Sequence, residues 1–261
     1  MAEPIFVEQT KKIALLIDGD NAQPSLIKQI LAESGKYGLV TIRRIYGDWT
    51  TTNMAGWKTA LHDSAIQPIQ QFRYTVGKNA TDSAMIIDTM DILHSHLVDA
   101  FCIVSSDSDY TRLATRIREM GFFVMGIGKR STPRAFVNAC NVFIYTENLV
   151  PPRESQHRRE RGGAKKGHER EEEPEGRERR GADPDPLLRG AFDMAVREDG
   201  WANLGEIGFY LRQLDPSFDP RTYGFKQLSQ LIKTRTNLFE VRAREEEGGG
   251  SAIYIRTKAE Q

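Results

Sequence analysis

The sequence is poor in cysteine, with only Cys102 and Cys140 among 261 residues. Both lie in apolar stretches, where a reduced core thiol is far more common than a disulfide bond. This excludes a secreted fold held together by disulfides and predicts a reducing, cytoplasmic location. Long hydrophobic runs are missing as well, and residues 1–9 lack the basic segment and apolar core of an export signal. We therefore expect neither export nor a membrane partner.

An excess of charge of one sign is also absent, since 36 Lys and Arg residues balance 36 Asp and Glu residues. A chain without net charge has no overall field that attracts polyanions, so any nucleic-acid site must be a local basic patch. The length exceeds that of one average domain and suits two. The search for function therefore turns to local motifs.

Two continuous apolar runs, Ile13–Ile17 and Ala100–Val104, show no polar alternation. Such runs are typical of strands that a parallel sheet buries on both faces. The first run ends in Asp18, and the second is followed by Asp107 and Asp109. Ligands of open α/β sheets bind at the carboxyl ends of strands. Asp-Gly-Asp-Asn also favours a plain turn, but two acidic strand ends together favour a site.

A third acidic position, Asp82, opens a predicted helix. Asp82 starts a stripe of residues spaced by three and four, which places it toward the core. This stripe consists of Asp82, Ile86, Met90, Leu93 and Leu97. The helix after Asp109 repeats the pattern with Leu113, Ile117 and Met120. Both helices are therefore predicted to point an acidic first turn inward, toward Asp18.

Four acids at one site would repel one another strongly. At about 5 Å and an effective dielectric constant of about 20, two carboxylates repel by about 3 kcal/mol. Protonation of one acid or a bound divalent cation must offset this repulsion. Because no Cys or His set suited to zinc lies nearby, Mg²⁺ or Mn²⁺ is the expected ion. Such an ion can activate water to attack a phosphodiester and stabilise the leaving oxygen.

Three motifs in this order resemble the NYN domain family of PIN-like nucleases. They are Ile-Asp-Gly-x-Asn at 17–21, Lys78 followed by Asp82, and Ser-x-Asp-Ser-Asp-Tyr at 105–110. The resemblance covers Lys12 to Leu149. It implies a Rossmann-like sheet, Mg²⁺ or Mn²⁺, and endonucleolytic cleavage of RNA. It matches Asp18, Asp82, Asp107 and Asp109 to the acidic cluster of the family, and Asn21 to its motif asparagine. Ser106 stands where many relatives carry Gly; serine is small enough that little consequence is expected, and a stiffer loop is the alternative.

The chain from residue 12 to 149 alternates predicted strands and helices. Further strands are expected at 39–46, 66–72, 122–127 and 142–145, and further helices after Pro24 and Asn53 and at 133–140. This repeated βα pattern predicts an α/β fold, a Rossmann-like (PIN-like) parallel sheet in a three-layer sandwich.

Basic and aromatic side chains follow the predicted strands on the edge that carries the acids. Cations there would hold RNA phosphates, and aromatic rings could stack bases. The expected cationic contacts are Arg73, Lys78, Lys129 and Arg130, with Asn21 beside them. Trp49 and Tyr74 are at least as typical of loops that merely cover a sheet. Asp88 and Asp91 fall off the buried stripe and are expected to face solvent.

Residues 151–182 are rich in Arg, Glu, Lys and Gly and almost free of aliphatic side chains. Such a segment buries too little apolar surface to offset its ordering entropy, so a flexible linker is predicted. It divides the chain into domains at 1–150 and 183–261.

The second domain is predicted to hold three helices followed by a hairpin, which is a small α+β winged helix. The segment Tyr223–Leu228 within this order is similar to the LOTUS family, also called OST-HTH, over Pro186 to Thr257. The resemblance implies RNA binding, although some relatives bind proteins instead. The cations selected for this role are Lys226, Lys233 and Arg235, together with Arg242 and Arg256.

These patterns together predict a metal-dependent endoribonuclease whose C-terminal module retains RNA. Two alternatives stay open at this point. Asp18-Gly19-Asp20 resembles the acid pair of haloacid dehalogenase-type phosphatases, but that motif requires Thr where Ala22 stands. The chain could also be a catalytically weak RNA-binding or adapter protein. A protein partner of the second domain and a homodimer are equally open.

Overall fold

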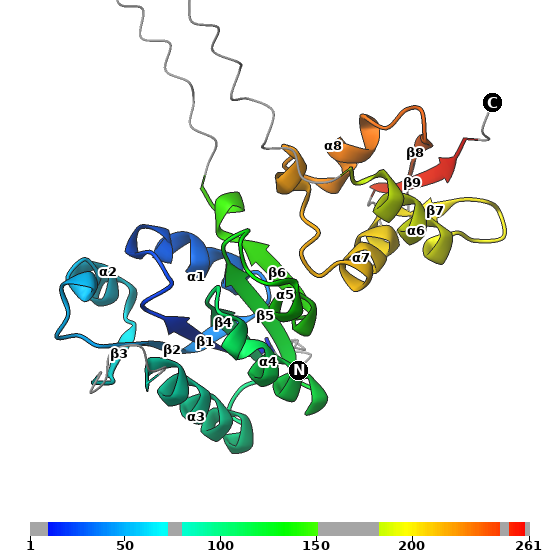
Figure 1. The fold of residues 1–261 in the computed structure, drawn as a ribbon. Coiled ribbons are helices and arrows are strands. Elements are labelled where there is room, and N and C mark those ends of the chain that lie inside the picture. Colours follow the sequence, from blue (N-terminus) through cyan, green and yellow to red (C-terminus); the bar gives the residue numbers. More distant parts are fainter. Residues whose placement is uncertain (1–9, 73–79, 151–182, 246–250, 259–261) are drawn as a thin grey trace, which may run out of the picture.

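The structure, a computed structural model, describes residues 10–72, 80–150, 183–245 and 251–258 (Figure 1). Of the selected residues, Arg73, Tyr74 and Lys78 lie outside these ranges, as does the predicted linker at 151–182. Within the described ranges, none of the helices has the length and apolar character needed to cross a membrane.

The N-terminal part is built on a six-stranded sheet in the order β3-β2-β1-β4-β5-β6. Every neighbouring pair in it runs parallel. The strands are β1 (Lys12–Asp18), β2 (Leu39–Gly47), β3 (Gln67–Gln70), β4 (Ala100–Val104), β5 (Phe123–Gly128) and β6 (Val142–Tyr145). The predicted Rossmann-like sheet is confirmed.

Helices cover both faces of this sheet (Figure 1). One layer holds α1 (Ile27–Gly35) and α2 (Trp57–Ser64), and the other holds α3 (Ala80–Ser95), α4 (Thr111–Glu119) and α5 (Arg134–Ala139). The central strand β1 serves both cores, because Leu15 packs with the first layer and Leu16 with the second. The lack of polar alternation in β1 follows from this double burial.

The buried stripe of α3 differs from the prediction by about one position. Met85, Thr89 and Leu93 are completely buried. Leu97 lies beyond the end of the helix and is 62% exposed. Asp82 consequently lies beside the stripe and is half-buried.

Two further predictions about acids are corrected by the fold. Asp88 does not face solvent freely, since its Oδ2 accepts hydrogen bonds from Arg44 Nη1 at 2.9 Å and from the Tyr46 hydroxyl at 3.0 Å. Asp109 is exposed, so the inward stripe of α4 begins only at Tyr110, which is fully buried.

The C-terminal part has its own core and its own sheet, in the order β7-β9-β8. Its helices are α6 (Asp185–Ala195), α7 (Leu204–Leu214) and α8 (Leu228–Lys233). Its strands are β7 (Ala202–Asn203), β8 (Phe239–Glu245) and β9 (Ser251–Thr257), and both pairings are antiparallel. Three helices and a terminal hairpin match the expected winged-helix order. Asn203 caps α7 by accepting a hydrogen bond from the Gly205 amide at 2.8 Å.

The end of α2 yields a stability prediction. Its C-cap residue, Ala65, is exposed and holds a left-handed backbone with φ of 49°. Because glycine adopts this conformation without a Cβ penalty, Ala65→Gly should raise the free energy of unfolding by about 1 kcal/mol. Ala60→Gly within α2 is the control, which should lower it by about 1 kcal/mol. Urea unfolding measures the free energy of unfolding of both variants, and a lower value for Ala65→Gly than for the unsubstituted protein would contradict this prediction.

Candidate functional site

The site lies where the strand order of the sheet reverses. The chain builds outward from β1 through β2 to β3 and then returns to place β4 on the other side of β1. Asp18 is the last residue of β1, and Asp107 follows β4 by three positions. Both acids therefore lie at the carboxyl edge, beside the switch point where open α/β sheets bind ligands.

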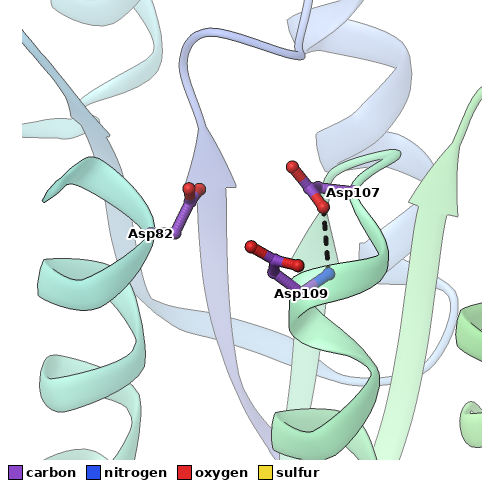
Figure 2. A group of neighbouring side chains, drawn as sticks. All are labelled: Asp82, Asp107 and Asp109. Atoms are coloured by element: carbon purple, nitrogen blue, oxygen red, sulfur yellow. Dashed lines mark hydrogen bonds between the residues drawn. The ribbon is translucent and has the colours of Figure 1, made fainter. Parts of the chain in front are cut away.

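Three carboxylates converge at this edge (Figure 2). Asp82 comes from the first turn of α3, and Asp107 and Asp109 come from the loop after β4. One carboxylate oxygen of each lies within 4.8 Å of the other two. We call these three residues the acid cluster.

The loop geometry explains why Asp107 and Asp109 point to the same place. Asp107 caps the short 3-10 helix Ser108–Tyr110, and its Oδ1 accepts a hydrogen bond from the Asp109 amide at 2.9 Å (Figure 2). This cap turns the chain tightly, so that the two carboxylates lie on the same side of the loop as Asp82. Asp109 stays exposed to solvent, which leaves it accessible to a ligand.

Asp82 is held by a buried tyrosine. The Tyr110 hydroxyl donates a hydrogen bond to Asp82 Oδ1 at 2.7 Å. The Tyr110 ring is completely buried and lies 6.4 Å from that of Phe136. Burial raises the pKa of Asp82, the hydrogen bond from Tyr110 lowers it, and the charges of neighbouring acids raise it again, so the pKa lies above its ordinary value. The tyrosine fixes the direction of a carboxylate that its acidic neighbours repel.

Asp18 lies beside the acid cluster rather than within it. Its side chain is 1% exposed, and its Oδ2 accepts hydrogen bonds from Asn21 Nδ2 at 2.6 Å and Ser105 Oγ at 2.8 Å. The Asp20 amide donates to Oδ1 at 3.1 Å. Burial raises the pKa of Asp18 despite these donors, and the charge of Asp82 adds to the increase. The amide of Asn21, selected above as an RNA contact, instead orients Asp18.

Two serines tie the loops of the site together. Ser105 donates to Asp18 and accepts a hydrogen bond from the Asp107 amide at 3.1 Å, which links β1 to the acid cluster. Ser106 Oγ accepts a hydrogen bond from the Lys129 amide at 2.9 Å, which links the loops after β4 and β5. A glycine at 106 would lack this hydroxyl, so Ser106 adds a link between the two loops that glycine could not make.

Sequence reasoning did not assign roles to Ser105 and Tyr110. Both positions carried a signal, since each is a polar residue within three positions of a motif acid. Ser105 immediately follows the buried strand β4, and Tyr110 immediately follows Asp109. A hydrogen-bonding side chain at such a place commonly orients its acidic neighbour.

The described basic residues do not form a single group. Lys129 and Arg130 are exposed in the loop after β5, next to the acid-bearing loop, and Lys226 and Lys233 are exposed on the C-terminal part. Arg235 is engaged elsewhere, because its Nε donates to Asp185 Oδ1 at 2.6 Å. Of the other selected cations, Arg242 and Arg256 both form ion pairs with Glu240, and Arg73 and Lys78 are not among the described residues.

The acid cluster fits a hard divalent cation. Carboxylate oxygens are the preferred ligands of Mg²⁺ and Mn²⁺. Oxygens at 2.0 to 2.1 Å from one octahedral ion lie about 2.9 Å apart when adjacent and about 4.2 Å apart when opposite, so three oxygens within 4.8 Å of one another would close by up to about 2 Å around the ion. All three members contribute oxygen, without nitrogen or sulfur.

Comparison with known proteins identifies both parts of the chain. The model of the NYN domain family matches residues 12–147, which is more than half of the chain. The model of the OST-HTH/LOTUS domain matches residues 183–250. No curated protein matches significantly.

Two solved structures share limited similarity with the chain. A protein of unknown function from Vibrio parahaemolyticus is 18% identical, covers 52% of this chain and 93% of its own, and superposes with a TM-score of 0.45. An uncharacterized protein from Nitrosomonas europaea is 37% identical over 38% of this chain and 95% of its own, with a TM-score of 0.30. At these scores neither likeness carries an argument about this chain.

The family match and the parallel six-stranded sheet agree. NYN domains are a PIN-like nuclease family, and the order of the strands here is that of a PIN-like α/β fold. The LOTUS match agrees with three helices and a hairpin in the C-terminal part. The chain therefore belongs to the NYN domain family and carries a C-terminal OST-HTH/LOTUS domain.

Proposed function

We propose that the protein is a divalent-metal-dependent endoribonuclease that hydrolyses RNA phosphodiester bonds, with the LOTUS domain retaining the RNA. The observation that carries the proposal is the acid cluster, in which three carboxylate oxygens lie within 4.8 Å of one another at the switch point of a PIN-like sheet. A fold gathers such charges at a stability cost, which is expected where they bind a cation.

Each residue of the site has a distinct task in this proposal. Asp82, Asp107 and Asp109 would hold Mg²⁺ or Mn²⁺, and Asp18 would add negative charge beside them. A bound ion of this kind lowers the pKa of water and stabilises the oxygen that leaves the phosphodiester. Tyr110 keeps Asp82 aimed at the cluster.

Phosphate binding falls to the exposed cations at the same edge. Lys129 and Arg130 extend from the loop after β5, which the hydroxyl of Ser106 ties to the acid-bearing loop. Their charges would hold the RNA backbone while the acids act on one phosphodiester. The LOTUS domain would raise the local concentration of RNA through contacts of its own, with Lys226 and Lys233 as its exposed candidates.

A cytoplasmic location agrees with the state of the two cysteines. Cys102 and Cys140 are both free and buried, and burial raises the pKa of the Cys102 thiol to about 12. Such thiols stay protonated and unreactive at neutral pH. The protein therefore requires no oxidising compartment.

The first prediction concerns cleavage. Asp107→Asn should lower Mn²⁺-dependent cleavage of a labelled RNA by at least about 100-fold, because a neutral amide binds a divalent cation poorly. The fold should stay intact, since an asparagine Oδ1 can still accept the hydrogen bond from the Asp109 amide.

Asp91→Asn is the matched control for this experiment. Asp91 is an exposed acid on α3 and lies outside the acid cluster. The same change of charge there should leave the cleavage rate unchanged. Full cleavage by the Asp107→Asn protein would refute the endoribonuclease assignment.

The second prediction concerns pH and stability without metal. The pKa of Asp82 is raised above its ordinary value of 3.8 by folding, so the folded state binds this proton more tightly than the unfolded chain does. Protonated Asp82 therefore makes its full contribution to the free energy of unfolding below pH 3.8, and this contribution is lost as pH rises through the folded-state pKa. Asp82→Asn should consequently raise the free energy of unfolding at neutral pH by about 1 kcal/mol, and the gain should disappear near about pH 4.

Urea unfolding in the presence of a chelator, repeated across this pH range, measures the effect. Added Mn²⁺ should then stabilise the unsubstituted protein more than the Asp82→Asn protein, because only the former retains the complete cluster. Equal stabilisation of both proteins by Mn²⁺ would place the metal somewhere else.

A further inference from the structure

The LOTUS domain is docked directly against the NYN domain. Figure 1 shows it beside the β6 side of the sheet. The contacts join α1, α5, β6 and the 3-10 helix Thr146–Asn148 of the NYN domain to residues 215–222, the segment that follows α7. We call this contact the domain interface.

Arg221 is the central residue of the domain interface. Its Nη1 and Nη2 donate to the two carboxylate oxygens of Glu33 on α1, at 3.1 and 3.0 Å. Its Nε and Nη2 also donate to Asp219, with the shortest distance at 2.6 Å. The planar guanidinium therefore bridges one acid from each domain in a fixed, two-pronged geometry.

Glu33 is a buried acid whose charge is compensated by Arg221. It is 7% exposed, although it is a charged residue on a helix. Burial raises the pKa of Glu33, but hydrogen bonds and charges from Arg221 and Lys36 outweigh that effect and hold the pKa below its ordinary value. Lys36 is largely exposed, so Arg221 supplies the buried part of this compensation.

Two further groups of contacts flank Arg221. On β6, the amide of the fully buried Phe143 donates to the Pro216 carbonyl at 2.8 Å, so the segment after α7 occupies a hydrogen-bonding position of the edge strand. Arg134 Nη1 donates to Ser217 Oγ at 3.1 Å, and Asn148 Nδ2 donates to Thr222 Oγ1 at 2.9 Å. Contacts from three separate elements fix orientation as well as distance.

The β6 part of the domain interface lies two strands from the strand that leads into the candidate site. In the sheet, β6 is separated from β4, which leads into Asp107 and Asp109, by β5 alone. Two strand spacings amount to about 10 Å. The loop after β5, with Lys129 and Arg130, lies between them. Burial raises the pKa of Tyr223 of the LOTUS domain, and Arg130 is near enough for its charge to oppose this rise. Exposed cations thus connect the acid cluster with the docked domain.

We propose that the domain interface holds the LOTUS domain at one distance and orientation from the acid cluster, so that RNA bound by this domain is cut at a set distance from the bound feature. The set distance of cleavage rests on the proposed function, whereas the docking of the LOTUS domain does not. The docking itself is a property of the protein without RNA. A LOTUS domain that is not docked in this way would let the cut fall over a wider range of positions.

The docking is tested first, on the full chain without RNA. Nitroxide labels on cysteines introduced at the exposed positions Asp91 and Asp193 report the distance between the domains by electron spin resonance. The unsubstituted interface should give one narrow distance distribution. Glu33→Gln and Arg221→Gln, from opposite sides of the interface, should each broaden it. The double variant should add little, because both substitutions break the same contact.

Arg197→Gln is the matched control. Arg197 forms an ion pair with Glu206, at 2.6 Å, entirely within the LOTUS domain. This variant should keep the narrow distribution. A broad distribution in the unsubstituted chain overturns the docking, and a narrow one in the Arg221→Gln protein overturns the central role of Arg221 in it. Circular dichroism of each variant establishes that both domains are folded.

The set distance of cleavage is tested second, by mapping cuts in an end-labelled RNA that carries one stem-loop in a long single strand. The unsubstituted protein should cut within a narrow window, and Arg221→Gln should spread the cuts over a window at least about threefold wider. Its rate on a short unstructured RNA should stay within about twofold of the original, since the acid cluster is untouched.

The two proposals fail in different ways. An unchanged window in a variant with a broadened distance distribution overturns the set distance while leaving the nuclease intact. Absence of any cleavage by the unsubstituted protein overturns the proposed function and, with it, the set distance, whereas the label distances still decide whether the domains are docked.

Discussion

Repulsion between carboxylates at the switch point of the sheet is the constraint on which the site depends. Asp82, Asp107 and Asp18 are each held by a hydrogen-bond donor that is itself fixed by the fold. Tyr110 is locked in the second core and holds Asp82, and the Asp107 cap is set by the backbone of its own turn. Ser105 ties buried Asp18 to the same loop. The charges are therefore held close together by the fold itself, as preorganised electrostatic sites require.

The placement of this edge was predictable because the signals for it are local. Burial on both faces removes polar alternation from β1 and β4, and β4 was predicted with the bounds that it has, Ala100–Val104. The phase of α3 was predicted less well because Thr89 belongs to its core stripe. Thr89 is completely buried and satisfies its hydroxyl by donating to the Met85 carbonyl at 2.6 Å. A stripe traced through apolar residues alone passes over such a position.

The interactions that orient the acids could not be predicted in the same way. Tyr110 and Asp82 are 28 positions apart, and nothing in either segment indicates their hydrogen bond. Glu33 and Arg221 are 188 positions apart, in two domains, and each reads as an ordinary surface charge on its own segment. Periodicity reports which face of an element is buried. It does not show which distant segment covers that face, and the domain interface is formed by pairs of residues from such distant segments.

Glu33, Asp18 and Asp82 together show what the acid cluster is suited to bind. All three are acids that burial affects, and burial raises the pKa of each. The pKa of Glu33 nevertheless lies below its ordinary value, because a guanidinium lies against both of its oxygens. Asp18 and Asp82 accept side-chain hydrogen bonds from the neutral groups of Asn21, Ser105 and Tyr110, and their pKa values stay raised. The same fold thus neutralises a buried carboxylate with an arginine where two domains meet. At the sheet edge it surrounds carboxylates with neutral donors that orient their charge without cancelling it, an arrangement that suits the divalent cation proposed for this site.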